Sequence, residues 1–88
     1  MKSHALRLFP GQDLKKELNA FALKLGLRAG FVVSCCGSLK ILKMRLADSV
    51  TLFERAEKFE ILSLQGTLSP DGAHLHISVG DREGKCWC

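Results

Sequence analysis

The protein has 88 residues, of which 47% are hydrophobic and 25% are charged, with a formal net charge of +4 and a mean hydropathy of +0.09. A chain of this length is too short for two independently folded units and predicts one globular domain over residues 1–88. No run of eighteen apolar residues occurs and the N-terminus has no long apolar core, which excludes a membrane span and a secretory signal and predicts an intracellular protein, cytoplasmic or nuclear.

The charges are distributed unevenly along the chain. Through Arg45 there are nine Lys or Arg residues and two acids, whereas the remainder has four Lys or Arg and seven acids. A basic half and an acidic half favour contacts between subunits or with an anionic partner. An ordinary solvated surface accounts for the same pattern, because no cluster of five or six basic residues occurs.

The first third of the sequence predicts a strand followed by a helix. Residues 5–9 alternate in polarity and predict a short strand that ends at Pro10-Gly11. Asp13 is a suitable N-cap, and Gly26 is suited to a left-handed helix end. The apolar residues between them recur at helical spacing and predict one amphipathic helix; they are Leu14, Leu18, Phe21, Ala22 and Leu25.

The rest of the sequence predicts strands. Residues 29–47 are β-prone and are divided by a bend or bulge at Gly37 into a buried strand and a half-exposed one. Residues 47–57 predict a loop or an irregular strand. Residues 58–79 predict a hairpin about the turn Ser69-Pro70-Asp71-Gly72, and a second turn at 80–84 leaves too few residues for another strand. The predicted fold is therefore α+β, a mainly antiparallel sheet with one packed amphipathic helix.

Two histidines lie two residues apart on the second strand of the predicted hairpin. Residues at this spacing face the same side of a strand, so the imidazoles of His74 and His76 can converge on one metal ion. Two polar residues on a solvated strand face are the alternative interpretation, which the spacing does not exclude.

Cys86 and Cys88 offer two further ligands of the type that zinc binds. Structural zinc sites usually separate their cysteines by two to four residues, whereas one intervening residue in an extended tail places the sulfurs on opposite sides. We therefore expect free thiols on a frayed terminus. No catalytic residue is predicted, because Cys35-Cys36 has no identifiable base partner and no nucleotide-binding or hydrolase motif occurs.

Three segments resemble the plant-and-prokaryote-conserved (PPC) domain: "ALRLFPGQDLKKELNAFALKLGLRAGFVVSCCGSL", "KFEILSLQGTLSPDG" and "HLHISVGDREGK". The resemblance implies an α/β sandwich-like fold that assembles as a homotrimer. In plant relatives an attached Arg-Gly-Arg-Pro motif, the AT-hook, holds DNA, while the domain mediates self-association and contacts with regulatory proteins. This sequence has no Arg-Gly-Arg-Pro, which argues against direct minor-groove binding.

The resemblance also implies a metal site and further strands after the last residue of this sequence. Some free-standing members hold a metal with a His-x-His pair and the histidine of a later Gly-Gly-His segment. Here His74 and His76 match the pair and the third ligand is absent, so zinc or another divalent metal would be held weakly. Because family members continue into further strands, we expect an incomplete domain, a truncated isoform that lacks C-terminal strands and has an open sheet edge.

Three functions follow from these observations. The first is a non-enzymatic, self-associating module of the trimer type with regulatory proteins as partners and an indirect role in DNA-associated regulation. The second is a metal-binding small-molecule binder or enzyme of unknown substrate, built on the histidine pair. The third is direct DNA binding through a basic face, for which the candidate contacts are Lys40, Lys43 and Arg45.

Overall fold

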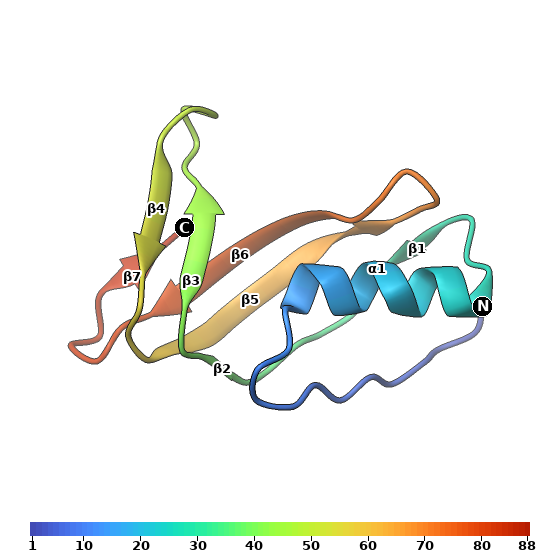
Figure 1. Ribbon diagram of the computed structural model, residues 1–88, viewed down its shortest axis with the longest axis horizontal. Helices are drawn as coiled ribbons and strands as arrows, with labels where there is room; N and C mark the ends of the chain where they lie inside the picture. The colour runs from blue at the N-terminus through green and yellow to red at the C-terminus, as the bar shows by residue number, and fades with distance from the viewer.

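The computed structural model describes residues 1–88 as a main antiparallel sheet, a separate two-stranded hairpin and one helix (Figure 1). The elements are α1 (Leu14–Leu25), β1 (Gly30–Phe31), β2 (Ser38–Leu39), β3 (Leu42–Arg45), β4 (Leu52–Arg55), β5 (Phe59–Leu68), β6 (His74–Gly80) and β7 (Cys86–Trp87). Every strand pair is antiparallel, which confirms the predicted α+β class. No helix is long and apolar enough to cross a membrane.

The ten-residue strand β5 organises the main sheet. One edge of β5 pairs with β6, from Glu60 opposite Gly80 to Thr67 opposite His74. Its other edge pairs with β1 at one end and with β2 at the other, and β7 adds to the far side of β6. The predicted hairpin is confirmed, as is its turn, in which the Gly72 N–H donates to the Ser69 carbonyl at 3.0 Å.

The helix forms where the sequence predicts it. The Asp13 side chain accepts a hydrogen bond from the Lys16 N–H at 3.0 Å, and Gly26 ends the helix in the left-handed conformation. The apolar side of α1 packs on one end of the main sheet, where Ala22, Leu68 and Ala73 are buried together. The helix thereby covers part of one face of the β5–β6 hairpin (Figure 1).

The hairpin of β3 and β4 covers the other end of the same sheet face. Leu42, Phe53, Phe59 and Val79 form a second buried cluster there. The prediction of a loop or irregular strand over residues 47–57 therefore holds only for its first part, because Leu52–Arg55 is a regular strand paired with β3.

Asp48 closes the turn between β3 and β4. Its carboxylate accepts hydrogen bonds from the Val50 N–H at 3.0 Å and the Thr51 N–H at 2.8 Å, and also from the Thr51 hydroxyl. The bonds from Thr51 and then Val50 hold the pKa of Asp48 below its usual value. These hydrogen bonds within the turn, rather than an alternating apolar pattern, determine where the β3–β4 hairpin reverses direction.

Two predictions about strands at the ends of the chain were wrong. Residues 5–9 run without regular structure, because no other strand lies beside them to complete a ladder. The final residues, in contrast, include the short strand β7, in which Cys86 pairs with Gly80. Between β1 and β2, residues 33–36 make no backbone hydrogen bond to β5, and this interruption lies next to the predicted break at Gly37.

Trp87 holds the end of the chain in place. Its ring packs on Phe53 with the centroids 4.5 Å apart, while Arg55 and Lys85 lie over the ring at 5.1 Å and 4.2 Å. The indole N–H donates to the Asp81 carboxylate at 3.1 Å. The prediction of a frayed terminus is corrected, because an aromatic anchor that contacts both sheets orders it.

Among the glycines, Gly66 has the least space for a side chain. A Cβ atom there would lie 2.0 Å from the backbone oxygen of His74, and its φ of 152° disfavours L side chains. We expect Gly66→Ala to lower the free energy of unfolding by roughly 3 kcal/mol or more in urea unfolding followed by circular dichroism. Gly72→Ala, where φ is 110° and no atom lies within 4 Å, should cost only about 1–2 kcal/mol. Equal losses in the two variants would contradict the close approach.

Trp87 is the only tryptophan and no tyrosine is present, so its fluorescence reports on the β6–β7 turn alone. Bonds from Trp87 and from the Lys85 backbone lower the pKa of Asp81. The resulting stabilisation is present above the unfolded-state pKa of about 3.9 and is lost as the pH falls through the lower folded-state value. We expect a red shift of Trp87 emission below about pH 4.

Asp81→Asn provides the control for this titration. An asparagine can still accept the two backbone bonds at Asp81 Oδ1, but its amide nitrogen cannot accept from the indole at Oδ2. The variant should show the red-shifted emission already at neutral pH and no further change on acidification. An acid transition of the same size in both proteins would show that another group is responsible.

Candidate functional site

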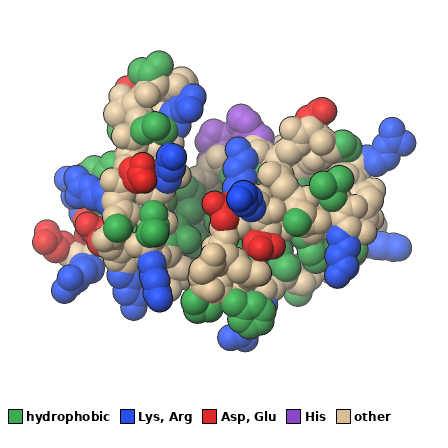
Figure 2. All heavy atoms as spheres, in the orientation of Figure 1, with side chains coloured by type: hydrophobic (Ala, Val, Ile, Leu, Met, Phe, Trp, Pro, Cys, Tyr) green, Lys and Arg blue, Asp and Glu red, His purple; other side chains and the backbone are tan.

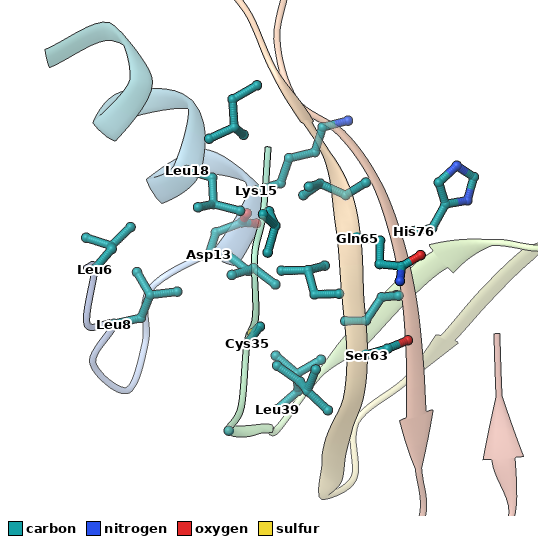
Figure 3. A pocket seen from close by; sticks show the side chains of 18 of the residues that line it. Leu6, Leu8, Asp13, Lys15, Leu18, Cys35, Leu39, Ser63, Gln65 and His76 are labelled. Carbon is teal, nitrogen blue, oxygen red and sulfur yellow. The ribbon is translucent and has the colours of Figure 1, made fainter. Parts of the chain in front are cut away.

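The candidate site is the polar face of the β5–β6 hairpin, opposite α1. Leu75, Ile77 and Val79 pack into the two buried clusters, so the alternating residues of β6 face outward. His74 and His76 are exposed there, with their ring centroids 5.1 Å apart at an interplanar angle of 63°. Figure 2 shows histidine side chains together at the upper rim, and Figure 3 shows His76 pointing away from the helix.

Strand pairing places small polar side chains beside the two histidines. Gln65 lies directly opposite His76 and Thr67 opposite His74, while the Ser63 and Ser78 hydroxyls hydrogen-bond to each other across the strands. Ser63, Gln65 and Thr67 were missed in the sequence. The detectable signal was their alternation with Leu64, Gly66 and Leu68 on β5, but only the register places Gln65 and Thr67 opposite the histidines and Ser63 opposite Ser78.

The structure brings the predicted histidine pair together but supplies no further metal ligand. No group of three or more His, Cys, Asp or Glu side chains able to hold a metal occurs in residues 1–88. Cys86 is exposed on β7 and Cys88 is exposed just beyond it, and neither joins the histidines in such a group. Two imidazoles on one face can hold a divalent ion only with water or another chain completing its coordination.

The environment of Cys35 disfavours its thiolate form. Cys35 is partly buried and Cys36 is exposed, within the irregular segment 32–37. Burial, followed by the charge of Cys36, raises the pKa of the Cys35 thiol. A raised pKa lowers the thiolate population, so Cys35 is a poor nucleophile at neutral pH.

The candidate DNA contacts lie on and beside the β3–β4 hairpin. Lys40 is exposed in the connection between β2 and β3, and Lys43 and Arg45 share the outward face of β3. Lys43 is directly opposite Glu54, and the Arg45 guanidinium donates to the Ser49 carbonyl at 3.4 Å. The Glu54 carboxylate offsets one positive charge of this face, and the bond to Ser49 occupies one of the guanidinium donors that could otherwise contact a phosphate group.

An open trough extends from the edge of the main sheet formed by β1, residues 32–37 and β2 to the face that carries His74 and His76. More than half of the residues of the chain line it, and just over half of these are hydrophobic. In Figure 3, Leu6 and Leu8 of the N-terminal segment project toward residues 32–37, beneath Leu18 of α1. The sequence analysis expected an open sheet edge but not this trough, because residues 5–9 were predicted to form a strand.

Solved structures share this fold. A hypothetical protein from Salmonella cholerae-suis superimposes with a TM-score of 0.91 and 39% identity, covering 96% of this chain and 61% of its own. A protein of Bacteroides thetaiotaomicron described as a candidate DNA-binding protein superimposes with a TM-score of 0.71 and 27% identity, covering 84% of this chain and 55% of its own. This chain thus spans about three fifths of the Salmonella protein.

Sequence comparison gives the family. The bifunctional protein GlmU of Synechococcus strain JA-3-3Ab is 49% identical over 87 residues, and GlmU of strain JA-2-3B'a(2-13) is 51% identical, the match covering 99% of this chain and 14% of each GlmU. The model of the Plants and Prokaryotes Conserved (PCC) domain, the family abbreviated PPC above, matches residues 1–88. This chain therefore belongs to the Plants and Prokaryotes Conserved domain family.

Proposed function

We propose that this chain is a non-enzymatic, self-associating module that forms homotrimers and contacts regulatory proteins, with an indirect role in DNA-associated regulation. The observation that carries the proposal is the amount of apolar surface left open. Only eight of 88 residues are buried, whereas large hydrophobic side chains are exposed on several elements. Contiguous exposed apolar surface on a small protein is typical of interaction sites, and association would bury it.

Several of these side chains lie away from the trough. Val50 and Leu52 are 78% and 54% exposed on and beside the β3–β4 hairpin, and Leu62 is 54% exposed on β5. Figure 2 shows hydrophobic side chains on the visible face of both the hairpin and the helix-bearing half. Trimeric stoichiometry rests on the family resemblance, and the link to DNA rests on the description of the Bacteroides relative.

Light scattering coupled to size-exclusion chromatography tests the assembly. We expect the wild-type chain to elute with three times its mass of 9.7 kDa. Leu62→Asp should shift the mass toward that of one chain, because it replaces exposed apolar surface on β5 with a charge. Gln65→Asp adds the same charge to the same strand without removing apolar surface and should remain trimeric. A wild-type monomer, or equal dissociation of both variants, would contradict the proposal.

A second candidate function is metal-dependent binding of a small molecule at the histidine pair. It is supported by the 5.1 Å separation of the two exposed rings on one strand face. In a self-associated form, a side chain of another copy could complete the coordination that this chain lacks alone. The pair would then act as a shared site, and neutral imidazole nitrogens would be the ligands.

Metal analysis distinguishes this candidate. We expect the protein dialysed against zinc to retain the metal, and His76→Ala to retain at least about tenfold less, because one remaining imidazole holds zinc poorly. His4→Ala is the matched control, since His4 packs against Phe21 with centroids 6.0 Å apart, away from the pair. Equal zinc content in the wild type and in His76→Ala would contradict a zinc site at the histidine pair.

A further inference from the structure

Two cysteines flank the tryptophan of β7. Trp87 lies opposite Val79, and its ring packs on Phe53 against the buried cluster between the main sheet and the β3–β4 hairpin. Successive side chains of a strand point to opposite faces of the sheet. Cys86 and Cys88, one residue on either side of the tryptophan, therefore both face away from that cluster, and both are exposed.

This arrangement corrects the expectation that the two sulfurs point to opposite sides. Residues two apart on a strand share a face, as His74 and His76 do on β6. Cys86 pairs in register with Gly80, so the cysteines lie on the same outer face of the sheet as the histidines. The pairing with β6 and the packing of the intervening indole ring set this geometry, and neither needs a residue beyond position 88.

The turn before β7 holds the strand in place. The Asp81 N–H donates to the Lys85 carbonyl at 2.9 Å. The Asp81 carboxylate accepts from the backbone N–H groups of Glu83 and Lys85, each at 2.9 Å. It also accepts from the indole N–H of Trp87 at 3.1 Å. Because this backbone is fixed before any ligand binds, the two thiols pay little ordering cost when they bind one.

The spacing allows both sulfurs to reach one metal ion. The Cα atoms of residues two apart on a strand are about 6.6 Å from each other. Two sulfurs bound on opposite sides of one ion, at a metal–sulfur distance of about 2.3 Å, are about 4.6 Å apart. Each cysteine side chain therefore has to lean toward the other by only about 1 Å, which a change of rotamer provides.

The surroundings of the pair favour a soft ion over a hard one. Gly80, opposite Cys86, has no side chain, and the Leu62 side chain lies over it, with carbon atoms 3.7–3.9 Å from where a Cβ would be. The other outward residues of β6 are serine and histidine, so this strand supplies no carboxylate of the type that magnesium, calcium or manganese prefers.

The number of ligands narrows the choice of ion further. No group of three or more His, Cys, Asp or Glu side chains able to hold a metal occurs in residues 1–88. Structural zinc takes four ligands, which a pair of thiols does not supply. Thiolates are soft ligands that select Cu(I), and a monovalent ion with a filled d shell is satisfied by two of them in a near-linear arrangement.

We propose that Cys86 and Cys88 bind one Cu(I) ion as two thiolates. Each sulfur forms one bond to copper and releases its thiol proton to solvent, so that Cu⁺ and two thiols give a complex of charge −1 and two protons. No electron is transferred. The site is separate from the histidine pair proposed for zinc, and it requires neither that pair nor self-association.

Competition with the Cu(I) chelator bathocuproine disulfonate tests the proposal on the intact chain, under anaerobic conditions with ascorbate to keep the copper reduced. We expect the wild type to hold one Cu(I) per chain. Cys86→Ser and Cys88→Ser should each weaken binding at least about tenfold, because losing one of two ligands costs more than losing an outer partner of a ligand. A wild type that takes no copper from the chelator, or a variant that binds as tightly as the wild type, would overturn the proposal.

The other two thiols provide the matched control. The double variant Cys35→Ser/Cys36→Ser removes the same number of cysteines from the irregular segment between β1 and β2 and should bind Cu(I) as the wild type does. An equal loss in this variant would show that any exposed thiol takes up copper and would overturn the site. His76→Ala should keep Cu(I) while it loses zinc, so that failure of the histidine site and failure of the thiol site give different results.

Trp87 emission locates the bound ion. It is the only tryptophan and lies between the two cysteines, so Cu(I) at this site should quench its fluorescence until one ion per chain has been added. Cys86→Ser should show unchanged emission without metal, which confirms that it is folded, and should lose the quenching. Quenching of the same size by Zn²⁺ at the same concentration would contradict a site selective for a soft monovalent ion.

Discussion

The close pairing of β5 with β6 is the constraint on which the other parts of the molecule depend. At Gly66 the two backbones lie so near that any Cβ would overlap the carbonyl of His74. This pairing sets the register that places Gln65 and Thr67 opposite the two histidines. The same strand also carries β1 and β2 on its other edge and supplies Phe59 and Leu68 to the two buried clusters.

The helix and the β3–β4 hairpin divide one face of this sheet between them. Each brings a small apolar cluster, one around Ala22 and one around Phe53, and the two clusters have no buried residue in common. Because each is small, the net burial is modest for a chain of 88 residues, and much apolar surface remains open to a partner. The proposed self-association would bury part of this surface and so stabilise the domain.

The opposite face and the free edge offer two different kinds of chemistry. The outer face of the β5–β6 hairpin is polar, with histidine, glutamine, threonine and serine side chains in register. The edge at β1 and β2 carries exposed apolar side chains, such as Phe31 and Val33, and unpaired backbone at residues 33–36. A segment similar to this chain also occurs within the much longer GlmU proteins.

The sequence by itself determined the elements whose signals are local. Asp13 and Gly26 delimit the helix through hydrogen bonds within a few residues, and the turn at Ser69–Gly72 fixes the central hairpin. The spacing of His74 and His76 placed both on one face, since side chains alternate along any strand. The motifs that resemble the family were also local, and the match over residues 1–88 bears them out.

Only the tertiary structure decided what depends on partners distant in the chain. Residues 5–9 alternate like a strand yet remain unpaired, because a strand needs a neighbour and the alternation does not supply one. Trp87 became an anchor because the hairpin brings Phe53 and Arg55 to it, contacts that no spacing predicts. The polar neighbours of the histidines likewise arise from register, which is a property of the assembled sheet.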